Sequence, residues 1–134
     1  MFAKGKITIV LSVMLLFIGF TSKVMAQNPP AVTIGNIDPA NHSTIAAITA
    51  QTGLQTATAG YFVSEYTLSL VSDDQNATVL ISPVTVNGAD LTQQIINDLN
   101  SHANQHTKLL LTGLRVMGGG MVMDGTAVTY TLDQ

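Results

Sequence analysis

The chain has 134 residues, a formal net charge of −3 and neither cysteine nor tryptophan. Its length allows one domain, and the lack of cysteine excludes a disulfide scaffold, a thiolate metal site and a cysteine nucleophile. Because five basic residues stand against eight acidic ones, the chain lacks the positive surface of a nucleic-acid-binding protein. Composition therefore indicates a small domain with no nucleic-acid partner.

The first 26 residues have the layout of a secretory signal peptide. Lys4 and Lys6 precede an almost wholly apolar stretch, residues 7–20, and Val24 and Ala26 fit the two positions where signal peptidase needs small side chains. As a helix this stretch would span about 21 Å, well short of the roughly 30 Å hydrocarbon core of a bilayer. We therefore expect cleavage after Ala26 and a periplasmic or secreted domain of residues 27–134, with no stable membrane insertion, in a Gram-negative envelope.

The first elements of the mature chain are short. Residues 31–34 predict an edge strand. Ile45 and Ile48 recur at helical spacing and Gly53 follows them, so we expect a helix over residues 43–52 with both isoleucines facing inward.

From residue 62 the hydrophobic period becomes two, which predicts a strand. A polar turn over residues 72–76 and a second apolar run from Thr78 predict a hairpin, and Pro83 suits an edge or a bulge. One face of the first strand carries Phe62, Ser64, Tyr66, Leu68 and Leu70.

A second helix is expected from Asp90, which can cap it with Gln93 in the capping-box position. Residues 108–117 form a nearly continuous apolar run, typical of a central strand, and residues 126–132 alternate as a closing strand. These elements predict an α+β fold, a mostly antiparallel, β-sandwich-like sheet with two short helices. The apolar stripe of the second helix consists of Leu91, Ile95, Ile96 and Leu99.

One spacing in the chain is typical of a metal site. Asp98, His102 and His106 are four residues apart, so a continued helix would align a carboxylate with two imidazoles that can hold zinc. The surrounding Asn, Ser and Gln residues favour an end of the helix near Ser101 and a solvated polar exit. We therefore expect no metal or cofactor, and a small metal-binding protein stays as the less favoured alternative. No Gly-x-Ser-x-Gly elbow occurs, and no pattern indicates catalytic residues or an enzyme.

Three consecutive glycines, residues 118–120, mark a loop between two apolar runs. A strand and not a helix follows them, and no basic residue lies beyond Arg115, so the pattern indicates a hairpin tip and not a phosphate cradle. Methionines around the tip offer a soft, adaptable contact surface. The sheet edge near residues 83–87 is a second candidate surface. We expect the loop over residues 118–125 to contact a partner, and the expected contact residues are Met117, Gly119, Met121, Met123 and Asp124.

Four blocks of the chain occur in an order typical of one known domain. They are residues 29–35, residues 45–54, the strand at residues 62–70 and a set of short motifs within residues 87–132. Together they resemble the C-terminal periplasmic domain of GldM, the gliding-motility and type IX secretion motor protein of Bacteroidetes. The chain departs from that family in its own export signal and in apolar residues 121–123, where basic residues are common in the family.

The resemblance implies a stand-alone docking module that binds an envelope protein or a second copy of itself, without catalysis. Apolar and backbone contacts, including strand addition at an open sheet edge, are the expected mode of binding. The alternative from a different class is a structural or adhesive surface protein that assembles through such an edge.

Overall fold

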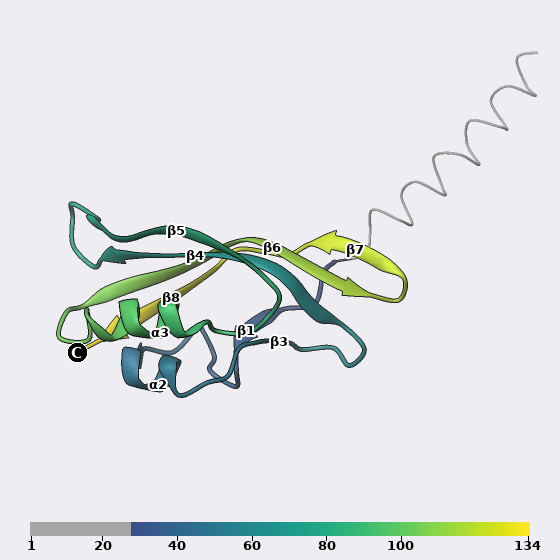
Figure 1. Cartoon of the computed structure of the whole chain (residues 1–134), viewed down its shortest axis with the longest axis horizontal. Helices are drawn as coiled ribbons and strands as arrows, with labels where there is room; N and C mark the ends of the chain where they lie inside the picture. The colour runs from purple at the N-terminus through teal and green to yellow at the C-terminus, as the bar shows by residue number, and fades with distance from the viewer. Residues whose placement is uncertain (1–27) are drawn as a thin grey trace, which may run out of the picture.

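The computed structural model describes residues 28–134, and the expected signal peptide lies outside this range. One long, six-stranded sheet dominates the fold (Figure 1). The strands of this sheet are β2 (Ser43–Thr44), β4 (Phe62–Ser72), β5 (Val79–Asn87), β6 (Thr107–Gly118), β7 (Met121–Asp124) and β8 (Val128–Asp133). They follow the order β2-β8-β6-β4-β5, and β7 also pairs with β6. All pairs are antiparallel except that of β2 with β8.

A second layer covers one face of the sheet (Figure 1). It contains α2 (Ile45–Thr49), α3 (Gln93–Asn100) and a two-stranded ribbon of β1 (Val32–Ile34) with β3 (Leu54–Thr56). The predicted α+β class with a mostly antiparallel sheet and two short helices is therefore confirmed. Within residues 28–134, no helix has the length and apolar composition that a bilayer crossing requires.

The core lies between the sheet and this second layer. Burial of each large apolar side chain stabilises the fold by about 1.5–3 kcal/mol. The strands contribute the fully buried Tyr66, Leu68, Leu70, Leu109, Leu111, Val116, Tyr130 and Leu132, which face Ile34, Ile48 and Leu99 of the covering layer.

Threonine hydroxyls begin both helices. Thr44 caps α2 and Thr92 caps α3, each by accepting the backbone N–H three residues later, at 3.1 Å and 3.3 Å. The prediction that Asp90 caps the second helix is wrong, because Asp90 pairs with Gly53 in an isolated bridge before the helix begins. The predicted helix over residues 43–52 is shorter than expected, because its first two residues form β2.

The alternation of β4 is interrupted by one bulge. Its register against β6 shifts between Val63 and Glu65, and an extra residue moves the following side chains to the other face. Val63 is therefore buried, whereas Phe62 is 55% exposed. The prediction that Phe62 shares a face with Tyr66 and Leu68 is wrong for this reason.

The C-terminal half follows the sequence pattern closely. β6 is central, between β4 and β8, and β5 with Pro83 lies at the edge of the sheet. Gly119 and Gly120 form the tip of the β6–β7 hairpin with φ angles of +58° and +76°. Two successive positive φ angles are those of the type I′ turn that suits a two-residue hairpin.

Two buried tyrosines fasten the covering layer to the sheet. The Tyr130 hydroxyl accepts the Ile34 N–H at 2.8 Å and donates to the Ile37 carbonyl at 2.7 Å. The Tyr66 hydroxyl donates to the Asp90 carbonyl at 2.7 Å. Each bond satisfies a backbone group that the sheet and the helices leave unpaired.

Candidate functional site

Exposed apolar side chains gather where the β6–β7 hairpin lies beside the start of β4. Phe62, Met117, Met121 and Val122 are 55%, 37%, 45% and 57% exposed, and we call these four residues the distal patch. They line a shallow hollow of about 340 Å³ together with Gly60 and the glycines of the hairpin tip. Only two other large apolar side chains among the described residues are similarly exposed, Val79 and Val84 of β5.

Three residues of the distal patch form a row across the strands. Phe62 pairs with Met117, and Met117 pairs with Val122. Cross-strand partners project from the same face of a sheet, so their side chains are neighbours. The adjacent Val63 and Val116 are buried against the covering layer. The row therefore lies on the face of the sheet that the covering layer leaves open.

A charged row borders the apolar one. Arg115 pairs with Glu65 of β4 and with Asp124 of β7. The Arg115 Nε lies 3.9 Å from the Glu65 Oε2, whereas Asp124 is exposed and makes no ion pair within residues 28–134. One cation therefore faces two carboxylates, and the border of the distal patch is net negative.

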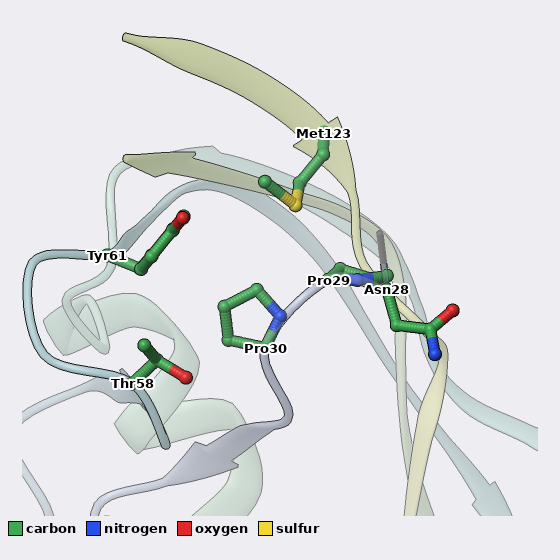
Figure 2. A pocket seen from close by; sticks show the side chains of 6 residues that line it. All are labelled: Asn28, Pro29, Pro30, Thr58, Tyr61 and Met123. Carbon is green, nitrogen blue, oxygen red and sulfur yellow. The ribbon is translucent and has the colours of Figure 1, made fainter. Parts of the chain in front are cut away.

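A second hollow, of about 300 Å³, lies at the same end of the molecule (Figure 2). Met123 lines it together with Tyr61, Thr58 and the lead-in residues Pro29 and Pro30. The aromatic ring of Tyr61 also packs against Gly118, where a Cβ would collide with it.

The five contact residues predicted from the sequence lie in different parts of the surface at this end of the molecule. Met117 and Met121 belong to the distal patch, Gly119 forms the turn beside it and Asp124 lies in the charged border. Met123 is half-buried in the other hollow.

Sequence reasoning missed Phe62 as a site residue, and it covered Val122 only as part of the expected contact loop over residues 118–125. Phe62 is exposed because of the bulge in β4, and no periodicity in the sequence reports a bulge. Val122 carried a usable signal, because it alternates with Met121 and Met123 directly after a glycine turn. The predicted surface near residues 83–87 lies on β5, where Val84 is 39% exposed.

The structure does not assemble the alternative metal site. Asp98 accepts a hydrogen bond from Gln94 at 3.0 Å, and His102 follows the end of α3 with a buried Nδ1 that has no partner among the described residues. His106 points elsewhere, with its Nδ1 3.6 Å from Asp133. Residues 28–134 contain no group of three or more His, Asp or Glu side chains arranged to hold a metal ion.

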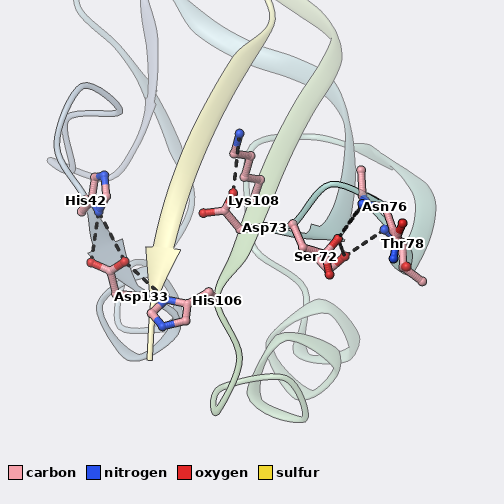
Figure 3. Close-up of polar contacts among 10 residues, drawn as sticks. His42, Ser72, Asp73, Asn76, Thr78, His106, Lys108 and Asp133 are labelled. Carbon is pink, nitrogen blue, oxygen red and sulfur yellow. Dashed lines mark hydrogen bonds and ion pairs between the residues drawn. The ribbon is translucent and has the colours of Figure 1, made fainter.

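Asp133 joins two histidines at the opposite end of the sheet (Figure 3). His42 Nδ1 lies 3.2 Å from the Asp133 carboxylate, on the other side from His106. Lys108 and Asp73 form a further ion pair nearby at 3.7 Å. All of these groups are well exposed, so each pair stabilises the fold by about 1 kcal/mol or less.

Among the described residues, the titratable groups with a displaced pKa lie in the core. Burial, with a smaller contribution from the Asp90 carboxylate, raises the pKa of Tyr66 to about 12. Burial likewise raises the pKa of Tyr130 above its ordinary value. Both hydroxyls form hydrogen bonds with backbone groups. The raised pKa values therefore make the stability of the fold depend on pH at alkaline pH.

The chain matches no known family model and none of the curated proteins with which it was compared. Functional inference therefore depends on the geometry and chemistry of the site itself.

Proposed function

We propose that the domain is a non-enzymatic protein-interaction module of the bacterial envelope that docks a partner protein on the distal patch. The carrying observation is the exposed row of Phe62, Met117 and Val122 across three strands. A contiguous apolar surface with a charged border is typical of protein-interaction sites.

The composition of the distal patch supports docking by burial of apolar surface. Phe62 offers a large aromatic face, and Met117 and Met121 offer flexible thioethers that adapt to the shape of a partner. The hollow between them is shallow and lined by glycine backbone, so a protein surface can approach the strands closely.

The secretory layout of residues 1–26 and the resemblance to the GldM C-terminal domain support an envelope location. On that basis the proposed partner is an envelope protein, and gliding motility or type IX secretion is the proposed setting.

Affinity capture with two matched variants of the domain, residues 27–134, tests the docking surface. Val122→Ser alters the distal patch, and Val79→Ser changes a valine of nearly equal exposure, 56% against 57%, at the start of β5. We expect Val122→Ser to reduce recovery of the bound envelope protein about tenfold, a loss of about 1.4 kcal/mol, and Val79→Ser to leave it unchanged. Equal recovery by the two variants would contradict docking on the distal patch.

A structural or adhesive protein that polymerises through an open sheet edge is the second candidate. The specific observation in its favour is the outer edge of β7, with which no strand pairs among the described residues. Sedimentation over a wide concentration range separates the two candidates, because a docking module stays a discrete species and an assembling protein grows with concentration.

A further inference from the structure

The turn of the β6–β7 hairpin determines which residue pairs of β6 and β7 exchange backbone hydrogen bonds. Gly118 and Met121 flank a two-residue turn, so they exchange the first pair of backbone hydrogen bonds. In an antiparallel ladder such pairs alternate with pairs that exchange none. At the far end of β7, the Gly125 N–H donates to the Leu114 carbonyl at 2.7 Å. Gly125 and Leu114 are therefore also a hydrogen-bonded pair, as the alternation that starts at the turn requires.

The intervening residues of β7 therefore direct their backbone groups outward. Val122 and Asp124 occupy the positions that exchange no hydrogen bonds with β6. Their N–H and C=O groups point away from β6, along an edge that no strand pairs with in residues 28–134. The exposed side chain of Val122 lies beside these groups.

The other long edge of the sheet is blocked. β5 contains Pro83, which has no N–H to donate, and its pairing with β4 shifts register twice. Proline and bulges are the features by which natural sheets prevent edge-to-edge pairing. β7 has neither feature, since its register against β6 runs without interruption from Gly118 to Arg115.

Charge defines the chemistry of the strand that fits this edge. Asp124 makes no ion pair within the described part of the chain, and the only basic residues in that part, Lys108 and Arg115, lie beside carboxylates. A second copy would add a surface of the same negative sign. A basic side chain on the incoming strand complements Asp124 directly.

We propose that the partner contributes an extended, basic segment that adds to the free edge of β7 as a further strand. This inference rests on the proposed function and deepens it. Because Val122 and Asp124 are two residues apart, their side chains face the same side of the sheet. The segment therefore carries an apolar residue beside Val122 and a lysine or arginine two positions away, beside Asp124.

Selection from a displayed library of random short peptides tests this inference, with the domain of residues 27–134 as bait. We expect the recovered sequences to place an apolar and a basic residue two positions apart. With the selected peptide bound, amide hydrogen exchange at Val122 and Asp124 should slow by about tenfold or more, because both N–H groups become hydrogen-bonded. Recovery of no peptide, of acidic peptides or of peptides with helical periodicity overturns the inference.

Two variants distinguish this inference from the docking proposal. We expect Asp124→Asn to weaken the selected peptide about tenfold and to flatten the salt dependence of its affinity. Peptide binding that requires Val122 but leaves amide exchange on β7 unchanged overturns strand addition and retains docking on the distal patch. Peptide binding that is insensitive to Val122→Ser overturns both. Dimers that form without peptide and protect the same amides identify a second copy as the occupant and also overturn the basic segment.

Discussion

The two long hairpins of the sheet end in opposite ways (Figure 1). At the tip of the β4–β5 hairpin, the Asp74 Oδ1 accepts hydrogen bonds from the Ser72 hydroxyl and from the Asn76 and Ala77 N–H groups, at 2.9–3.0 Å. The Asp73 N–H donates to the His106 carbonyl at 3.0 Å, which ties this tip to the start of β6. Polar side chains thus satisfy the tip from within (Figure 3).

At the tip of the β6–β7 hairpin, glycine backbone makes the turn and apolar side chains surround it. The comparison teaches that the molecule separates two tasks along one sheet. At the β4–β5 end and in the core, polar groups form internal hydrogen bonds that stabilise the fold. At the β6–β7 end, apolar side chains and a strand edge are exposed and can contact a partner. Variants of the first region should change stability without changing binding, and variants of the second should do the reverse.

The largest expected effect on stability is that of Tyr130→Phe. It leaves the Ile34 N–H and the Ile37 carbonyl without their partner in the core. We expect the free energy of unfolding to fall by about 2–4 kcal/mol, measured by urea denaturation. Tyr61→Phe is the matched control, because the Tyr61 hydroxyl makes no hydrogen bond within residues 28–134. Equal effects of the two variants would show that the Tyr130 hydroxyl does not fasten the ribbon.

Alkaline pH provides the next test of the core. The pKa of Tyr66 is about 12 in the folded state against 10.0 ordinarily, so between these pH values only the unfolded state releases the proton. The contribution of Tyr66 to stability is full below pH 10 and should fall by about 1.4 kcal/mol per pH unit between pH 10 and pH 12. In Tyr66→Phe the decline should be smaller, although not absent, because the pKa of Tyr130 is also raised. An unchanged slope would contradict the assignment to Tyr66.

Asp74→Ala tests the polar tip alone. The change removes an acceptor used by three donors, and we expect a loss of about 1–2 kcal/mol in the free energy of unfolding. Asp73→Ala is the control, because it removes only an exposed ion pair with Lys108, worth about 0.5 kcal/mol or less. Neither variant should alter partner binding; a loss of binding in Asp74→Ala would break the separation of tasks.

Thr107→Val has the smallest expected effect and the opposite sign. Thr107 is fully buried and its hydroxyl has no partner within residues 28–134, so a methyl group of the same shape removes an uncompensated desolvation cost. Thermal unfolding should show a gain of about 1 kcal/mol. Thr112→Val on the open face should stay within about 0.5 kcal/mol of the parent. A loss of stability in Thr107→Val would indicate that the hydroxyl is engaged.

Much of the fold was predictable from local pattern. The continuous apolar run of β6 predicted a central strand, and the alternation of Tyr130 and Leu132 predicted the buried face of β8. What the pattern did not contain were the bulge of β4 and the choice of Thr92 over Asp90 as helix cap. Both depend on tertiary pairing. The bulge is an extra residue of β4 in its pairing with β6, and the bridge between Asp90 and Gly53 places Asp90 before the helix.

The candidate site was predictable only in the part that depends on local sequence. Met117 and Met121 follow from their position beside the glycine turn, which is local information. Phe62 reaches the distal patch from a strand more than 50 residues earlier, through its register with Met117. Such a row exists only after the sheet has formed.

Site-specific photo-crosslinking tests the central claim most directly. A photoreactive residue would replace Val122 in one form of the full-length protein and Val79 in the other, two valines of almost equal exposure in different strands. We predict a discrete adduct with an envelope protein from position 122 and none from position 79. The same adduct from both positions, or an adduct from position 79 alone, would contradict the assignment of binding to the β6–β7 end.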